Sequence, residues 1–260
     1  DLLADHAGVT GSGMPEHLSS VGNTVPDVVV GACWPAVFAV LGAARTGSGR
    51  SVIEGMLDLV HLDHQVHLVR DLPSETAILA VKATSRSVRD TDLGRVVEVH
   101  VEIGVMDGAQ GLETPVVATL VERFAIRGRT GKGELTDPPR AGGALSNDVT
   151  ETPRKRRRDT TITTPWDMGA FAEVSGDHNP IHTSTAAALL AGLGSPIVHG
   201  MWLSAAAQHV VSADDPAAAV PSRTLTSWTS RFLGMVRLHP PSQAEMDLNN
   251  VVRAALEVTA

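Results

Sequence analysis

The sequence predicts an α+β fold in which antiparallel sheets are each wrapped around a buried helix. Residues 31–44 and 200–211 read as helices that are apolar on almost every face, as expected of a helix surrounded by protein. Four consecutive β-type segments follow the first of these helices. A buried helix followed by an antiparallel meander is the arrangement of a sheet that curls around a helix.

The first half of the chain supplies the clearest strand signals. In residues 95–105 apolar and polar side chains alternate, which is typical of a strand with one buried face. Turn signals such as Asp71-Leu-Pro73 and Met106-Asp-Gly108 separate the segments. The helix over residues 31–44 contains Pro35 early, where proline fits the first turn. We expect strands at residues 51–69, 76–88, 95–105 and 115–126.

The second half of the chain repeats this layout in part. Thr164 predicts the start of a helix that ends near Gly176, and Thr183 or Ser184 predicts the start of another that ends near Ala191. This second sheet looks short by at least one strand, which favours a chain that stops before the natural end of its domain. We expect strands at residues 160–163, 223–236, 246–251 and 254–259.

A change of composition divides the chain. Residues 128–158 are rich in Gly, Pro, Thr and Asn and contain the basic block Arg154-Lys-Arg-Arg-Arg158. This composition indicates a linker, and a nuclear-localisation or anion-binding patch is the alternative interpretation of the basic block. We therefore predict one domain over residues 1–130, a linker over 131–158, and a second domain over 159–260 that is cut short at its C-terminus.

Bulk composition excludes several classes of protein. The chain has 260 residues, 43% hydrophobic and 19% charged, and a formal net charge of -8, which argues against a disordered tail and a nucleic-acid binder. No apolar run approaches the roughly 18 residues of a membrane helix, so we expect no membrane partner. Cys33 is the only cysteine, which favours a reducing, cytoplasmic compartment. Because the chain begins at Asp1 rather than at a methionine, we expect a piece of a longer protein.

The segment from Val174 to His182 carries the most chemical information. It places the carboxylate of Asp177 and the imidazole of His182 five residues apart. Gly176 can leave a helix through the left-handed region, and Pro180 disfavours a helical conformation in the residue before it. The resulting turn allows both side chains to converge on one small volume, as general acid–base catalysis requires.

Three segments together resemble the signature of the MaoC-like (R)-specific hydratases and dehydratases, a family with the hot-dog fold: residues 171–182, which include Gly-Asp-His-Asn-Pro-Ile-His, residues 186–188 and residues 197–201. Three further segments resemble the dehydratase region of actinobacterial type I fatty-acid synthases, a double hot dog within a multifunctional chain: residues 31–38, 59–64 and 231–236. The resemblance covers most of the chain and fades after Arg237. It implies a double hot dog with a non-catalytic first domain, which lacks a Gly-Asp-x-Asn-Pro-x-His counterpart, and a catalytic second domain.

The resemblance implies a hydro-lyase that dehydrates (3R)-3-hydroxyacyl thioesters to trans-2-enoyl thioesters in fatty-acid synthesis. An acyl carrier protein domain would carry the substrate, and other synthase domains in a larger oligomeric complex would be partners. We expect His182 to take the C2 proton and Asp177, positioned by Asn179, to handle the 3-hydroxyl, although which residue performs which step stays open. The backbone N–H of Gly200 is expected to bind the developing enolate oxygen. We expect neither a cofactor nor a metal.

Two other functions remain alternatives: a freestanding (R)-specific enoyl-CoA hydratase and a non-catalytic acyl-binding or scaffold module. The other polar residues near the motif have structural interpretations. His178 is expected to face solvent or to border the site, and His199 is expected to cap the following helix. Ser204, Gln208 and His209 are interpreted as polar core groups with hydrogen-bond partners.

A metal site is not expected among the histidines of residues 61–67. Strand alternation would place His61, Asp63 and His67 on one face of a strand. In an extended chain these residues would spread over about 20 Å, which is too far for one ion without other ligands.

Overall fold

The computed structural model contains two compact units. One unit comprises residues 1–28, 146–225 and 234–260, and the other comprises residues 29–145 and 226–233. Each unit has its own helices and its own sheet. Within the two units the structure describes residues 2–18, 24–53, 55, 57–73, 76–91, 94–106, 115–127, 134–136, 155–214, 224–238 and 251–258.

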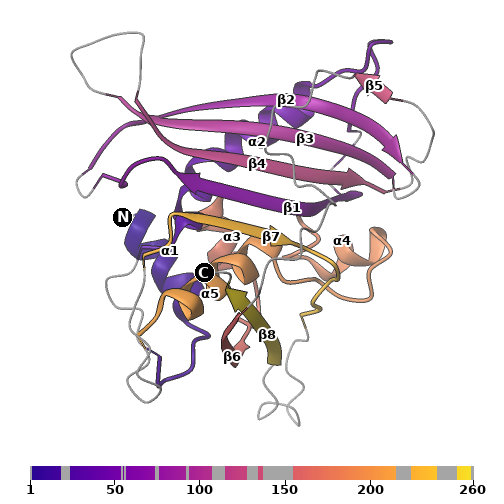
Figure 1. The fold of residues 1–260 in the computed structure, drawn as a ribbon. Helices are drawn as coiled ribbons and strands as arrows, with labels where there is room; N and C mark the ends of the chain where they lie inside the picture. Colours follow the sequence, from indigo (N-terminus) through magenta and orange to yellow (C-terminus); the bar gives the residue numbers. More distant parts are fainter. Residues whose placement is uncertain are drawn as a thin grey trace. The chain divides into compact units, whose positions relative to one another are not determined.

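The unit of residues 29–145 and 226–233 is built on one antiparallel sheet (Figure 1). Its strands lie in the order β5-β2-β3-β4-β1-β7, and each pairs antiparallel with its neighbours. The predicted strands over 76–88, 95–105 and 115–126 are confirmed with small shifts of their ends, whereas β1 is shorter than the predicted 51–69. The bounds are β1 Leu59–Leu68, β2 Leu79–Thr91, β3 Gly94–Val105, β4 Val116–Ile126, β5 Glu134–Thr136 and β7 Ser227–Arg231.

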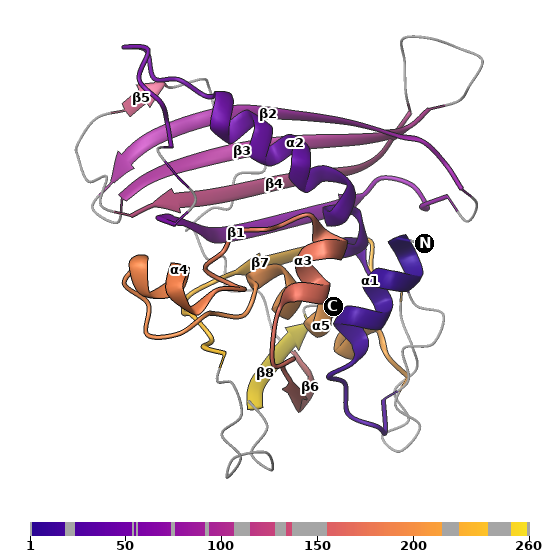
Figure 2. The same ribbon diagram turned by 180° about the vertical axis from the view of Figure 1, so that it is seen from behind.

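Helix α2 (Val30–Ala43) crosses one face of this sheet and contacts β2 and β3 (Figure 2). Its buried side chains recur every three or four residues, which is the spacing of one helix face. The predicted helix over residues 31–44 is therefore confirmed, with Pro35 inside it. These buried side chains are Val30, Cys33, Trp34, Val37 and Leu41.

The helical segment Pro26–Ala43 corrects one expectation. It has 18 residues and is apolar enough to cross a membrane by length and composition, so the expectation that no such run exists was wrong. Half of this segment is buried, and the core helix of a globular domain passes the same test. Because α2 covers a sheet face with its apolar side chains, we interpret it as a core helix.

Helix α5 (Gly200–Ser212) is the buried helix of the other unit. It contacts α1 (Leu2–Gly11), and α1 also packs against α3 (Gly169–Ser175). The indole Nε1 of Trp202 on α5 donates a hydrogen bond to the carbonyl of Val9 on α1 over 3.0 Å. Most residues of α5 are buried, which confirms the predicted helix over residues 200–211. Helix α1 was not predicted.

Strands β6 (Lys155–Thr163) and β8 (Val251–Val258) pair antiparallel in the same unit. They correspond to the predicted strands at 160–163 and 254–259. Nearly all of the predicted strand at 246–251 lies outside the described residues.

The predicted strand at residues 223–236 was wrong in extent and in partner. Only Ser227–Arg231 forms a strand, β7, and it pairs with β1 in the sheet of the other unit. An apolar–polar pattern shows that a segment is extended, but the backbone groups at a sheet edge accept any extended segment. The pairing partner therefore could not be read from the pattern.

The two compact units differ from the predicted domains in two segments. Residues 1–28 belong with residues 146–225, because α1 packs against α3 and α5 rather than against the first sheet. Residues 226–233 belong with residues 29–145, because β7 pairs with β1. Most of the predicted linker, residues 137–154, lies outside the described residues. Near the start of the predicted linker, β5 forms and pairs with β2. Near its end, β6 begins at Lys155.

Candidate active site

The loop after α3 has the irregular conformation that the sequence predicts. Gly176 follows the last helical residue with a φ of 71°, and its N–H bonds to the carbonyl of Ala172 over 2.9 Å. This left-handed conformation costs glycine little, so the chain turns sharply before Asp177. The helix itself starts at Gly169 rather than at the predicted Thr164.

Two side chains in the loop hold its backbone in place. Oδ1 of Asp177 accepts a hydrogen bond from the N–H of Asn179 over 3.1 Å, and Oδ1 of Asn179 accepts from the N–H of Ile181 over 3.4 Å. Bonds of this kind replace the helical pattern that Pro180 disrupts. Asn179 is buried, which agrees with a positioning role.

The next helix, α4 (Thr185–Leu190), begins at a side-chain cap. The hydroxyl of Ser184 accepts a hydrogen bond from the N–H of Ala187 over 3.3 Å, so Ser184 and not Thr183 is the cap. The cap fixes the chain directly after His182.

Asp177 and His182 converge, as predicted, and His199 joins them. The nitrogen or carboxylate atoms of these three side chains lie within 4.8 Å of one another. Nδ1 of His199 lies 3.2 Å from Oδ2 of Asp177. The rings of His182 and His199 stack with their centroids 3.7 Å apart and an interplanar angle of 24°.

The tautomer of His182 follows from its hydrogen bond. Nδ1 of His182 lies 2.9 Å from the carbonyl oxygen of Ile197, which can only accept, so Nδ1 carries the proton. In the neutral ring Nε2 is then the nitrogen without a proton and can act as a base. His182 is buried, which restricts the access of bulk water to this nitrogen.

Asp177 is a carboxylate at neutral pH. Burial raises the pKa of this group, but the hydrogen bond and charge of His199, the charge of His182 and the N–H of Asn179 lower it further than burial raises it. The net effect is a pKa below the usual aspartate value, so the resting site contains an anion held by hydrogen-bond donors.

His199 was misinterpreted as a structural cap. It occupies the position before α5, yet its side chain makes no capping hydrogen bond and points to Asp177 instead. Its backbone N–H bonds to the sulfur of Met168 over 3.4 Å, and the ring of Phe171 lies 5.2 Å away. The signal that could have identified it is its place in the segment 197–201 of the family signature.

Gly200 and His178 lie where the sequence predicts. Gly200 is the first residue of α5, at the end of the helix where N–H groups lack intrahelical acceptors. Its role in binding an oxyanion stays a prediction. His178 is exposed and lies 3.9 Å from the carboxylate of Glu173, so it faces solvent rather than Asp177.

The three converging groups could in principle hold a metal ion, and no other such group occurs among the described residues. The lone pairs of imidazole nitrogens lie in the ring plane. Because the rings of His182 and His199 are stacked and nearly parallel, their lone pairs do not aim at one point. Nδ1 of His199 is also engaged with Asp177. The geometry therefore suits an acid–base site better than a tetrahedral metal site.

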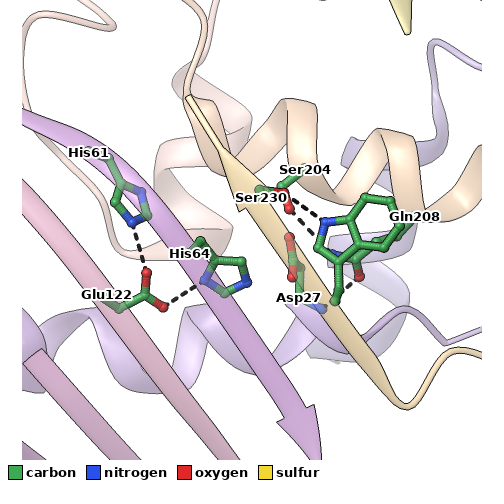
Figure 3. A network of polar contacts seen from close by, with 8 residues as sticks. Asp27, His61, His64, Glu122, Ser204, Gln208 and Ser230 are labelled. Carbon is green, nitrogen blue, oxygen red and sulfur yellow. Dashed lines mark hydrogen bonds and ion pairs between the residues drawn. The ribbon is translucent and has the colours of Figure 1, made fainter. Parts of the chain in front are cut away.

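The polar groups of α5 are mostly paired, as expected. Nε2 of Gln208 donates to the hydroxyl of Ser204 over 3.3 Å, and Oε1 of Gln208 accepts from the N–H of Asp27 over 3.1 Å (Figure 3). The Thr10 hydroxyl donates to a backbone carbonyl, so Nε2 of His209 donates to that hydroxyl over 2.9 Å. These groups stabilise the helix and do not contribute to the cluster at Asp177.

A second buried cluster lies in the other sheet and corrects the predicted strand faces. The register of β1 against β4 shifts between His61 and Asp63. His61 and His64 therefore lie on one face with Glu122, whereas Asp63 forms an ion pair with Arg123 and does not share a face with His61. Glu122 accepts from Nε2 of His61 over 2.8 Å and from Nδ1 of His64 over 2.7 Å (Figure 3). Burial raises the pKa of Glu122, but the two histidines lower it more, so Glu122 is ionised.

Comparison with known proteins identifies the part of the chain that contains the site. The family model described as MaoC like domain matches residues 146–258. This range contains Asp177, His182, His199 and Gly200.

Two curated relatives match parts of the same chain. The fatty acid synthase beta subunit stcK of Emericella nidulans is 36% identical over 90 residues, which are 33% of this chain and 4% of the relative. The mitochondrial 3-hydroxyacyl-[acyl-carrier-protein] dehydratase of Arabidopsis thaliana is 35% identical over 77 residues, which are 30% of this chain and 46% of the relative. The chain therefore spans less than half the length of either relative.

A solved structure shows the same fold. The crystal structure of HtdX of Mycobacterium tuberculosis superposes with a TM-score of 0.59 at 21% identity, over 91% of this chain and 79% of that chain. Together with the helices and antiparallel sheets described above, this likeness confirms the predicted α+β double hot-dog class. Residues 146–258 of this chain are thus similar in sequence to MaoC-like domains, and parts of the chain are similar to a fatty acid synthase beta subunit and to a 3-hydroxyacyl-[acyl-carrier-protein] dehydratase.

Proposed function

We propose that this chain dehydrates (3R)-3-hydroxyacyl thioesters to trans-2-enoyl thioesters in fatty-acid synthesis. The observation that carries the proposal is the convergence of Asp177 and His182 within a MaoC-like domain, with one group anionic and the other able to act as a base. Eliminating water across two neighbouring carbons needs two proton-transferring groups at this spacing.

The reaction balances with these two groups and one proton exchanged with solvent. His182 takes the C2 proton on Nε2, the electron pair of the C2–H bond forms the C2–C3 double bond, and the C3–O bond breaks. Asp177 delivers a proton to the leaving hydroxide, which departs as water. Because the pKa of Asp177 is lowered, the carboxylate takes up one proton from solvent before the step, and Nε2 of His182 returns the C2 proton to solvent afterwards, so protons balance over one turnover. In the hydration direction the same carboxylate can activate a water molecule directly.

The opposite assignment has Asp177 as the base at C2 and a protonated His182 as the acid. Exchange of the C2 proton in heavy water separates the two assignments, because only the variant that lacks the C2 base loses the exchange. We expect His182→Gln to lose the exchange of the C2 proton. In Asp177→Asn we expect the rate of this exchange to fall less than the rate of dehydration.

Gly200 is the proposed source of the oxyanion donor. Removing the C2 proton places negative charge on the thioester oxygen, and the backbone N–H at the start of α5 can stabilise it. The helix dipole has its positive end there, and α5 is long enough to contribute it. A glycine at this position lets the thioester approach the backbone.

The names of the relatives support a substrate bound to an acyl carrier protein, with other synthase domains as partners in an oligomeric assembly. The proposed cytoplasmic location rests only on the single cysteine of the chain. The alternative is an (R)-specific enoyl-CoA hydratase that acts on free coenzyme A thioesters. Parallel assays with the same acyl group on a carrier protein and on coenzyme A distinguish the two by their kcat/KM values.

The test of the proposal follows the ultraviolet absorbance of the enoyl thioester. Wild-type protein should convert (3R)-hydroxyacyl and not (3S)-hydroxyacyl thioesters. Asp177→Asn and His182→Gln should each lower kcat by about 10²- to 10⁴-fold without changing the thermal unfolding temperature. His178→Gln, in the same loop but exposed, is the matched control and should keep its activity. Near-normal turnover in either site variant would reject the assignment. A folded wild-type protein inert toward hydroxyacyl and enoyl thioesters would favour the acyl-binding module.

A further inference from the structure

We propose that His199 is a positioning residue for this site, which orients Asp177 through its Nδ1–H and fixes the plane of the His182 ring by stacking. The inference rests on the proposed function for its kinetic consequences, but its geometric content does not depend on substrate. It assigns a role to the third side chain of the cluster, which lies outside the loop with Asp177 and His182.

The hydrogen bond to Asp177 is the first support. Nδ1 of His199 lies 3.2 Å from Oδ2 of Asp177, while Oδ1 of the same carboxylate accepts from the N–H of Asn179 over 3.1 Å. The two carboxylate oxygens are therefore held by donors from two different elements. A carboxylate held at both oxygens cannot rotate freely, which keeps it in one orientation toward His182.

The packing of the imidazole ring is the second support. The His199 ring stacks on His182 at a centroid distance of 3.7 Å, and Phe171 packs against it at 5.2 Å. The backbone N–H of His199 bonds to Met168. With a side chain that is 1% exposed, His199 has little freedom to move, so it can transmit a fixed orientation to both partners.

The donor atom of His199 follows from its partner. A carboxylate oxygen only accepts, so Nδ1 carries the proton that faces Asp177, and Nε2 is buried with no hydrogen-bond partner among the described residues. The charged or titratable groups that act on Asp177 are His199 and His182. The nearby pair of His178 and Glu173 is exposed.

Two substitutions separate the donor from the ring. His199→Phe keeps a ring that can stack on His182 but removes the N–H that faces Asp177. His199→Asn removes the ring but places an amide N–H near the position of Nδ1. If the N–H donor of His199 orients Asp177, the pKa of the Asp177 carboxyl group should stay close to wild type in the asparagine variant. In the phenylalanine variant it should change.

The primary measurement is the pKa of the Asp177 carboxyl group, followed by ¹³C NMR in protein labelled at aspartate and assigned with Asp177→Asn. We expect His199→Phe to raise this pKa and His199→Asn to leave it close to wild type. The kinetic measurement is the pH profile of kcat/KM, whose acidic limb should move to higher pH in His199→Phe. We also expect kcat in this variant to fall by about tenfold or more, with a smaller change in KM.

The outcomes are distinguishable. An unchanged Asp177 pKa in folded His199→Phe overturns the inference, whatever the activity. If wild-type protein turns over no thioester, the proposed function fails, while the NMR measurement still tests the positioning of Asp177. If His199→Phe does not fold, His199→Gln takes its place, because the glutamine amide lies one methylene farther from the backbone than the asparagine amide. Equal Asp177 pKa values in the asparagine and glutamine variants then overturn the inference. His178→Asn is the control and should leave the Asp177 pKa unchanged.

Discussion

Acidification is expected to destabilise the unit that contains the site, through two buried histidines. His6 and His209 are each 1% exposed, and burial lowers the pKa of each from 6.5 to about 4, with Asp27 opposing the effect. Nδ1 of each ring is buried without a hydrogen-bond partner among the described residues. Because the folded pKa lies below the unfolded one, the unfolded chain binds protons first. The free energy of unfolding therefore falls as pH drops below 6.5, and this fall ends near pH 4.

The magnitude follows from the shift of His6. A fall from 6.5 to about 4 spans roughly 2.5 pKa units, and each unit corresponds to about 1.4 kcal/mol. Protonation of His6 should thus cost roughly 3 kcal/mol in full, and roughly 2 kcal/mol between neutral pH and about pH 5. A typical domain has a free energy of unfolding of about 5–15 kcal/mol, so this loss is measurable.

The perturbation is His6→Leu, which keeps an apolar side chain in the buried position and removes the titrating group. Urea unfolding followed by circular dichroism at about pH 7.5 and about pH 5 gives the pH dependence of the free energy of unfolding. The variant should lose roughly 2 kcal/mol less than wild type between the two conditions. His17→Gln, at an exposed histidine after α1, is the control and should follow wild type. A pH dependence in His6→Leu equal to that of wild type would refute the reasoning.

Two further substitutions test other parts of the structure. Gly200→Val should lower kcat by about 10- to 100-fold through a displaced thioester, with a smaller effect on thermal unfolding; unchanged turnover would count against the oxyanion role. Glu122→Gln should cost about 1–3 kcal/mol in urea unfolding, because an amide has one acceptor oxygen and cannot serve both His61 and His64. Glu102→Gln, whose carboxylate pairs with Lys82 at the surface, is the matched control and should change stability by less than about 1 kcal/mol. Equal effects of the two glutamine substitutions would contradict the role of the buried cluster.

Features that depend on a few neighbouring residues could be predicted from the sequence. Gly176 ends α3 in the left-handed conformation, and Ser184 caps α4. Asp177 and His182 converge because they lie in one short loop, whose shape follows from a glycine, a proline and two side-chain-to-backbone bonds. Hydrogen bonds over two or three residues form whatever the rest of the chain does, so the sequence contains enough information to place these groups together.

Features that depend on pairing across long separations could not be predicted. Strand β7 joins β1, and α1 joins α3 and α5, although neither partner is close in the sequence. The irregularity between His61 and Asp63 reverses which side chains share a face, and a one-residue shift of this kind leaves no clear trace in the pattern.

Within the site, His199 is the residue whose place depends on tertiary packing rather than on its neighbours in the sequence. It lies at the start of α5, outside the loop of Asp177 and His182, and a position before a helix equally suits a capping residue. Its contact with Asp177 exists because α5 and the loop pack together in three dimensions. The sequence brings Asp177 and His182 together through short-range hydrogen bonds, whereas the third member of the cluster depends on long-range packing that no local pattern encodes.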